Sequence, residues 1–300
     1  MNLTDSPRLA ASARYADIML VVVAVIWGTS YGVAKQALVF YPVLGFLFIR
    51  FTLTFLLLLP ALKGNLLKAL GPGLPLGLIL LGIFICETYG VAQTGASNAA
   101  FLISLCIVFT PFMEFAVFRQ RPSLTIICAA CISVFGALLL TGGGDVEMNR
   151  GDCLMIAAAV LRAVMVCFTR KLTAGTDVPA LALTAVQTGV VGLGSLLVLL
   201  LSPGEIPPLP TDTSFWLATL YLVVFCTLFA FFAQNYALRR TSPSRASLLM
   251  GSEPLFGALF AVLWLNEVLS VSAWIGGLMI VLASLWATRP PKEHPVPVQA

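Results

Sequence analysis

The stretch DIMLVVVAVIWGTSYGVAKQA, residues 17–37, is a run of 21 residues whose only charges stand near its two ends. A helix of about 20 apolar residues is long enough to span the hydrocarbon of a bilayer. Runs of similar length recur along the whole chain of 300 residues, of which 59% are hydrophobic and 10% are charged. An ordinary soluble domain has roughly 25% charged residues, so lipid must cover part of this chain.

These apolar runs are predicted to be helices rather than strands of a barrel. In a membrane interior without water, only helices and closed barrels satisfy the backbone polar groups. Barrel strands alternate over about ten residues, whereas these runs are longer and apolar on all sides. We therefore predict an all-α, polytopic membrane protein with ten transmembrane helices. The expected spans are residues 17–37, 42–62, 73–93, 97–118, 123–142, 152–171, 179–201, 213–237, 245–265 and 270–288.

Lysine and arginine are distributed unevenly over the loops between these spans. If the N-terminus is cytoplasmic, thirteen of them lie on the cytoplasmic side and only Lys35 and Arg150 lie outside. Positively charged loops remain on the cytoplasmic side of a membrane, so the bias predicts cytoplasmic N- and C-termini. The cytoplasmic set is Arg8, Arg14, Lys63, Lys68, Arg119, Arg121, Arg170, Lys171, Arg239, Arg240, Arg245, Arg289 and Lys292.

The chain also repeats itself weakly, at an offset of 135 residues early in each half and of 147 residues later. Because each half has an odd number of spans, the second half must cross the membrane in the opposite sense, as in many secondary transporters. We predict two inverted five-helix repeats around a central cavity, 17–144 and 152–288, between tails at 1–16 and 289–300. Aligned pairs include Asp17 with Asp152, Trp27 with Arg162, Glu87 with Gln234, Tyr89 with Tyr236 and Thr94 with Thr241.

Short motifs in both halves carry a resemblance to a known family. They are IWGTS at 26–30, ASNAAFL at 96–102, and TSPSRASLL at 241–249, the last followed by Glu253-Pro254 and Asn266-Glu267. With these motifs the chain resembles the ten-helix, EamA-type members of the drug/metabolite transporter superfamily. In length and helix count it is similar to the YddG-type amino-acid exporters. The resemblance implies a multi-pass carrier of the bacterial inner membrane that exports amino acids or other small metabolites.

Two charges fall near the middle of predicted spans, where a charge costs several kcal/mol unless it is paired or hydrated. Arg162 lies about ten residues into the sixth span, and Glu253 lies about nine residues into the ninth. An arginine fork suits a carboxylate. Pro254 is expected to loosen the helix turn beside Glu253, which suits a substrate amine, a cation or a proton. The alternatives are a structural ion pair for Arg162 and a structural kink at Glu253.

Polar residues of the third and eighth spans are the next candidates. Glu87, Tyr89 and Gln93 lie in the outer half of the third span, and the repeat pairs Glu87 with Gln234. Residues paired by an inverted repeat would flank a central cavity from two sides. The alternative is hydrogen bonding between helices alone.

Aromatic residues of the first span are candidates for the walls of the site. Trp27 and Tyr31 are one helical turn apart, and Gly28 and Gly32 have the spacing that permits close helix approach. Together with Tyr89 they would supply apolar walls, although core packing explains them equally well. Arg50 and Glu114 lie nearer to span ends, and we expect these two charges to reach toward an interface.

Several functions are excluded by missing motifs. The chain has no G-x-x-x-x-G-K-[ST] or H-E-x-x-H sequence, so we predict that it is not an enzyme and has no cofactor. No metal site is expected. The single histidine, His294, lies in the polar tail, and Cys128-x-x-Cys131 lies in an apolar span without histidine or acidic residues beside it, which is typical of small packing residues. The net charge of +4 is dispersed among loops, which does not favour nucleic acid as a partner.

The sequence thus predicts a secondary transporter that exports small metabolites, amino acids above all, by alternating access. In this hypothesis Arg162 binds a substrate carboxylate, while Glu253 or Glu87 binds an amine or a coupling proton. The partners are the small-molecule substrate and the lipid bilayer. Export of a nucleoside, a sugar derivative or a cationic compound is the alternative within transport, and a membrane protein without transport activity is the alternative outside it.

Overall fold

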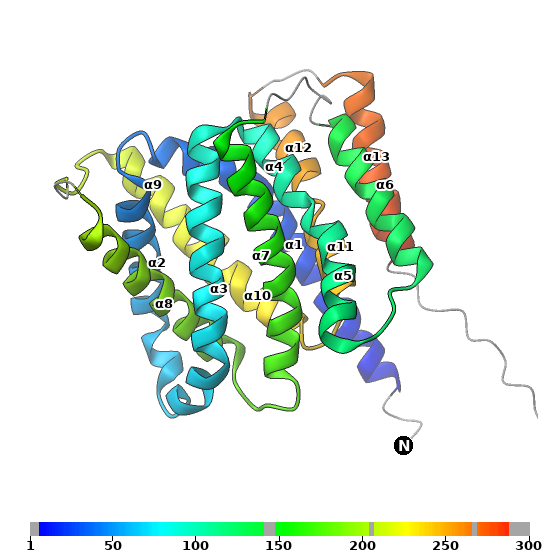
Figure 1. The fold of residues 1–300 in the computed structure, drawn as a ribbon, viewed down its shortest axis with the longest axis horizontal. Coiled ribbons are helices and arrows are strands. Elements are labelled where there is room, and N and C mark those ends of the chain that lie inside the picture. Colours follow the sequence, from blue (N-terminus) through cyan, green and yellow to red (C-terminus); the bar gives the residue numbers. More distant parts are fainter. Residues whose placement is uncertain (1–5, 141–147, 204–206, 266–268, 288–300) are drawn as a thin grey trace, which may run out of the picture.

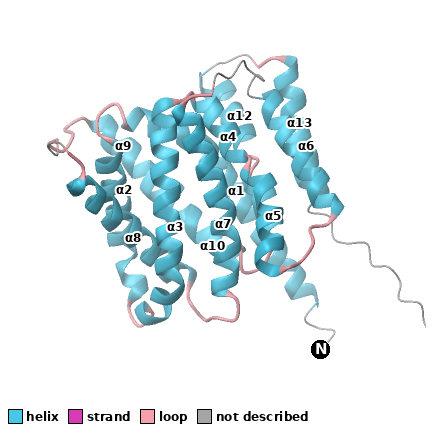
Figure 2. Cartoon of the chain, in the orientation of Figure 1, coloured by secondary structure: helices cyan, strands magenta, loops and turns pink. Residues whose placement is uncertain are grey.

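A computed structural model describes residues 6–140, 148–203, 207–265 and 269–287, and within these ranges every regular element is a helix (Figure 2). Seven of the described helical segments are long and apolar enough to cross a membrane. The chain is therefore a polytopic α-helical membrane protein. The first-half elements are α1 (Ser6–Ala37), α2 (Val43–Leu62), α3 (Leu66–Gln93), α4 (Ala96–Ser104), α5 (Cys106–Phe118) and α6 (Leu124–Leu140). Those of the second half are α7 (Arg150–Thr173), α8 (Ala180–Leu201), α9 (Thr213–Tyr221), the π-helix η1 (Leu222–Phe229), α10 (Ala230–Ala237), α11 (Pro243–Met250), α12 (Glu253–Leu265) and α13 (Val271–Ala287).

The helices form one bundle with the connections gathered at its two ends (Figure 1). In this view α1 begins at the lower end and α7 begins at the upper end. The most extensive pairings join the two halves of the chain, α2 with α8, α3 with α7 and α6 with α13. The helix α1 packs against α10, α11 and α12, so the second half of the chain surrounds it.

Three of the predicted spans are not regular α-helices. The span at 97–118 is interrupted at Leu105, between α4 and α5, and the span at 245–265 is interrupted at 251–252, between α11 and α12. The span at 213–237 contains η1, and π-helical segments are frequent at functional sites. Pro254 therefore does not loosen a continuous helix, as the sequence suggested. The helix has already ended at Met250, and Pro254 occupies the first turn of α12, where a missing N–H costs little.

The N-terminal boundary also differs from the prediction. Residues 6–16, expected as part of a tail, belong to α1. The alanine-rich sequence between Arg8 and Ala16 favours helix, and Pro7 suits a first helical turn. Hydropathy detects the membrane-spanning part of a helix but not its polar extension. The predicted tail at 289–300, including His294, and the Asn266-Glu267 motif lie outside the described residues.

Candidate functional site

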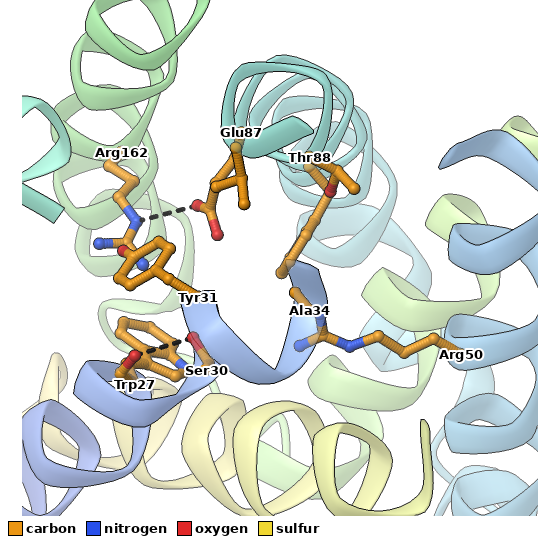
Figure 3. A pocket seen from close by; sticks show the side chains of 10 residues that line it. Trp27, Ser30, Tyr31, Ala34, Arg50, Glu87, Thr88 and Arg162 are labelled. Atoms are coloured by element: carbon orange, nitrogen blue, oxygen red, sulfur yellow. Dashed lines mark hydrogen bonds and ion pairs between the residues drawn. The ribbon is translucent and has the colours of Figure 1, made fainter. Parts of the chain in front are cut away.

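Two glutamates flank the guanidinium of Arg162 near the middle of α7. Its Nη1 donates to Glu253 Oε1 at 2.9 Å. Its Nε lies 3.8 Å from Glu87 Oε2, an ion pair too long for a hydrogen bond (Figure 3). The other oxygen of Glu253 accepts a hydrogen bond from the Tyr31 hydroxyl at 2.8 Å. Four of the side chains singled out from the sequence thus meet in one cluster, from α1, α3, α7 and α12.

The interruption between α11 and α12 places Glu253 in this cluster. Glu253 is the first residue of α12, at a helix N-terminus, where the helix dipole favours a carboxylate. Its side chain is only 2% exposed. A carboxylate this buried requires partners, because an uncompensated buried charge costs about 3–5 kcal/mol, and Arg162 and Tyr31 provide them.

Gly28 sets the distance between α1 and α12. A Cβ on Gly28 would lie 2.7 Å from the Glu253 carbonyl oxygen and 2.8 Å from the Gly257 nitrogen, closer than real Cβ atoms come to backbone. Only glycine therefore permits this approach, which brings Glu253 within reach of Tyr31. Gly32 has no atom within 4 Å of its hypothetical Cβ, so the predicted close approach holds for the first glycine of the pair and not for the second.

Two small neighbouring cavities border the Arg162 cluster. Each has a volume of about 20 Å³, enough for roughly one water molecule. A metabolite needs more space than either cavity provides in this structure. The first cavity is lined by Trp27, Ser30, Tyr31, Ala34, Arg50, Phe84, Glu87, Thr88, Val91 and Arg162. The second is lined by Trp27, Leu80, Ile83, Phe84, Glu87, Arg162, Met165, Phe231 and Gln234.

Two hydrogen-bond acceptors of these cavity walls lack a donor. Glu87 Oε2 and Gln234 Oε1 are buried and accept no hydrogen bond from a described residue. A buried acceptor without a donor costs about 1–3 kcal/mol, so each would gain from a ligand that carries donors. The two residues are the pair that the offset of 147 aligned, and they come from α3 and α10.

Trp27 forms an aromatic wall beside this site. The Arg162 guanidinium carbon lies 4.6 Å from the centre of the Trp27 ring, a cation–π contact. The indole N–H donates to the Cys226 carbonyl oxygen at 2.9 Å, which fixes the ring. The repeat partners Trp27 and Arg162 are therefore in direct contact.

Of the eight predicted site residues, Glu253, Tyr89 and Gln93 do not line either cavity. Glu253 lies behind the cavity wall, where it binds Arg162 and Tyr31. Tyr89 is half-buried, and Gln93 is exposed with its amide nitrogen bonded to the Tyr89 carbonyl oxygen of its own helix at 3.0 Å. Tyr89 follows Glu87 by two residues, which turns it to the far side of a helix with 3.6 residues per turn. The helical period from Glu87 instead selects Phe84 and Val91, which do line the cavity and could have been found in this way.

The expectation that Arg50 reaches toward an interface is wrong. Arg50 is 5% exposed and lines the first cavity (Figure 3). Its Nε donates to Thr227 Oγ1 at 2.8 Å, and its guanidinium packs on Phe51 and Phe84. A partner on η1, 177 residues away in sequence, holds the side chain inside the bundle. Glu114 likewise points into the protein, where it accepts hydrogen bonds from the backbone and the hydroxyl of Ser244.

The fold and this charged centre define a class, a multi-pass helical membrane protein with an ionic polar site enclosed by its helices. The sequence pattern of the EamA-like transporter family matches residues 14–142 and again residues 149–289. The chain belongs to the EamA-like transporter family, within the drug/metabolite transporter superfamily. It is therefore a transporter and not an enzyme.

Individual relatives cover most of the chain at low identity. An uncharacterized transporter of Archaeoglobus fulgidus is 27% identical over 90% of this chain and 84% of its own length. The uncharacterized inner membrane transporter YedA of Escherichia coli is 26% identical over 88% of this chain and 87% of its own. A probable terminal-alkyne amino-acid exporter of Streptantibioticus cattleyicolor is 24% identical over 67% of each chain.

The fold itself is shared with a solved protein. One crystal structure superposes with a TM-score of 0.74 over 91% of this chain and 96% of the other, at 18% sequence identity. The likeness at this identity concerns the fold alone.

Proposed function

We propose that this protein is a secondary carrier of the inner membrane that exports small metabolites, amino acids in particular, by alternating access. The observation that carries the proposal is the partly buried arginine between two glutamates at the wall of a cavity, beside acceptors that lack donors. Positively and negatively charged side chains within the membrane suit a substrate that carries one positive and one negative group. The relative named as an amino-acid exporter supports the same class, and YedA supports the inner membrane.

The proposal includes ten spans in two inverted repeats, 17–144 and 152–288. The double match of the family pattern supports two related halves. The interruptions add to this, because the offset of 147 that aligns the later parts of the halves relates Leu105 to Ser252, one in each break. The opposite starting ends of α1 and α7 (Figure 1) support the inversion, and the lysine and arginine bias supports cytoplasmic termini.

Two further contacts have equivalent places in the halves. Asp17 at the start of the first span binds Arg245, with Oδ1 accepting from Nε at 3.1 Å. Asp152, its partner at the offset of 135, accepts from Asn98 Nδ2 at 2.6 Å and from the Thr94 hydroxyl at 2.7 Å. Asn98 and Arg245 are related by the offset of 147. In each half, a residue of the first helix therefore contacts the fourth span of the other half. We call these two contacts, Asp17 with Arg245 and Asp152 with Asn98, the ties. Inversion puts the two ties at opposite ends of the bundle.

These two ties are proposed to alternate during transport. In alternating access a repeat pair exchanges conformations around a central site. Opening one end then requires one tie to separate while the other holds. Both ties are formed in this structure, together with cavities too small for a metabolite, which fits a closed intermediate between the two open states.

The substrate amine is proposed to bind at Glu87 and Gln234. An ammonium group carries three donors, and Glu87 Oε2 and Gln234 Oε1 are the buried acceptors of the cavity walls that lack one. Arg162 stays a predicted carboxylate ligand. Because Glu253 already occupies its Nη1, a substrate carboxylate that binds both terminal nitrogens of Arg162 would have to exchange with Glu253, and protonation of Glu253 would release the arginine. This competition is a route by which a proton could be coupled to transport.

Counterflow in proteoliposomes tests the proposed function. Purified protein is reconstituted, vesicles are loaded with one unlabelled amino acid at a time, and uptake of its labelled form is followed. We expect counterflow for a subset of amino acids. Nucleosides, sugar derivatives and quaternary amines complete the panel. Counterflow restricted to one of those classes would replace the amino-acid assignment, and its absence for every compound would contradict the carrier function.

Glu87→Gln is expected to raise the KM for the transported amino acid by about tenfold, the effect of losing a charge-assisted hydrogen bond. The glutamine keeps the size of the side chain while it removes the charge that attracts an ammonium group. Initial rates of counterflow over a range of substrate concentrations measure the change. Glu114→Gln is the matched control, since it makes the same substitution at a glutamate that contacts Ser244 and lines neither cavity, and its KM should stay within about twofold.

The ties predict opposite effects of two aspartate substitutions. Asp17→Asn should favour opening at the end where α1 begins, and Asp152→Asn should favour opening at the other end. A single cysteine at Ala34, in a cysteine-free background, reports access from each side to an impermeant maleimide. The partly buried ion pair of Asp17 contributes about 1 kcal/mol or less, and a hydrogen bond to Asp152 contributes about 1 kcal/mol, so each substitution should change such a population roughly twofold to fivefold.

The control for these two variants is Asp177→Asn, which changes an exposed loop aspartate. It should leave labelling from both sides unchanged. If the Asp17 and Asp152 variants both raised labelling from the same side, the assignment of the ties to opposite ends of an inverted repeat would be wrong.

A further inference from the structure

The cavity beside Arg162 has a second guanidinium, that of Arg50, whose role the cluster of glutamates does not explain. Arg50 is 95% buried, since only 5% of its surface is exposed. The ion pairs of the described residues involve Arg162 and Arg245, and none involves Arg50. A buried cation within the membrane is costly and marks substrate or ion pathways by default.

The π-helix η1 holds Arg50 by one nitrogen only. The Thr227 hydroxyl donates to the Leu222 carbonyl oxygen, five residues earlier in η1, at 2.8 Å. Its oxygen therefore faces Arg50 as an acceptor and takes the Nε hydrogen at 2.8 Å. Among the described residues, Nη1 and Nη2 of Arg50 have no hydrogen-bond acceptor, and neither is a fully enclosed atom. The forked end of the guanidinium is thus left available.

Aromatic rings stabilise the charge without consuming its donors. The guanidinium carbon lies 5.3 Å from the centre of the Phe51 ring and 5.1 Å from that of Phe84. Contacts of this kind attract a cation through the ring faces and leave its N–H edge free. Thr227 on one side and the two rings on the other keep the side chain extended toward the cavity, from the side opposite Arg162 (Figure 3).

We propose that Arg50 binds the anionic group of the substrate. This inference rests on the transport function proposed above and deepens it. Arg162 is engaged by Glu253 in this conformation, whereas the two terminal nitrogens of Arg50 match the two oxygens of a carboxylate. In the conformation of this structure the substrate carboxylate lies at Arg50, and it would reach Arg162 only after Glu253 releases that arginine. The ammonium group lies at Glu87 and Gln234, across the same pair of cavities. The transported class is a small zwitterion that carries both groups.

A comparison of amino acids with their carboxamides tests this inference. Each amino acid that shows counterflow is paired with its own amide, L-phenylalanine with L-phenylalaninamide for example, since the amide keeps the amine and loses the negative charge. The wild-type protein should prefer the amino acid by about tenfold or more in kcat/KM, the effect of one charge-assisted contact. Arg50→Gln should lower this preference to about one, chiefly by slowing the amino acid.

A matched variant separates this role from a structural one. Arg170→Gln makes the same substitution at the end of α7, where the arginine contacts the Thr241 carbonyl oxygen, and it should keep the wild-type preference. If Arg50→Gln does not fold, Thr227→Val is used instead. It keeps the arginine, removes its brace, and should lower the preference about threefold or more through weaker positioning.

The outcomes are distinct. The inference is overturned if Arg50→Gln, or Thr227→Val where that variant is used, keeps the wild-type preference for the amino acid over its amide. The carboxylate would then bind elsewhere. Counterflow of the wild-type protein would still stand in that case. If the wild-type protein moves no amino acid at all, the proposed function itself fails, and the comparison with amides is not needed to establish that.

Discussion

Glu253→Ala is expected to abolish transport and to destabilise the protein by about 3–5 kcal/mol, the cost of leaving one member of a buried ion pair unpaired. Arg162 would keep only the 3.8 Å approach of Glu87, and the Tyr31 hydroxyl would lose its acceptor. Glu253→Gln keeps an acceptor for Tyr31 and should therefore be less destabilising, while it still removes the charge. Thermal unfolding in detergent, followed by tryptophan fluorescence, and counterflow in liposomes measure the two effects.

A double-mutant cycle with Arg162→Ala identifies the source of this effect. The double variant removes both charges, so neither is left without its partner. Its loss of stability should therefore be smaller than the sum of the two single losses by roughly 2 kcal/mol. Additive losses would mean that the two side chains do not stabilise each other. A double variant that regains stability but not transport would separate the structural role of the pair from its role in binding.

Gly28→Ala is expected to cost about 1–3 kcal/mol of stability, as overpacking does, and most of the transport activity. The new methyl group would meet the backbone of α12 at Glu253 and Gly257, at 2.7 and 2.8 Å, and backbone cannot rotate away as a side chain can. The helix α12 must then move off α1. That movement separates Glu253 from Tyr31 and shifts it against Arg162.

Gly32→Ala is the matched control, one helical turn further along α1. Gly32 is exposed and its Cβ would meet no atom within 4 Å, so the substitution should be neutral or stabilising by up to about 1 kcal/mol through helix propensity. Equal losses in the two variants would mean that flexibility of α1, rather than the approach of α12, is what the glycines provide. Thermal unfolding and counterflow of the two proteins side by side decide between these explanations.

The sequence by itself was sufficient for the class of protein and for much of its site. Runs of about 20 apolar residues predicted the helical membrane fold, because a chain in lipid can satisfy its backbone in very few ways. The cost of a charge inside the membrane singled out Arg162, Glu87 and Glu253, and the structure brings all three together. The repeat aligned Trp27 with Arg162, which are in contact.

The tertiary structure decided what each side chain faces. Hydropathy measures how deep a residue lies but not the direction in which it points, so it could not distinguish Glu87, which lines a cavity, from Gln93, which is exposed. It also assigned Arg50 to an interface. That assignment failed because the partner of Arg50, the Thr227 hydroxyl, depends on η1 and is remote in sequence.

Apolar runs such as residues 17–37 require lipid to cover part of this chain, and the sequence alone determines this because composition and run length are properties of the chain itself. Which charges are paired inside the bundle is a property of contacts between helices. Arg162 lies beside two carboxylates, whereas Arg50 has no carboxylate partner among the described residues, although both arginines belong to apolar spans. Only the packing of α2, α7 and α12 around α1 and α3 made that difference, and it is the difference on which the proposed binding of a zwitterion depends.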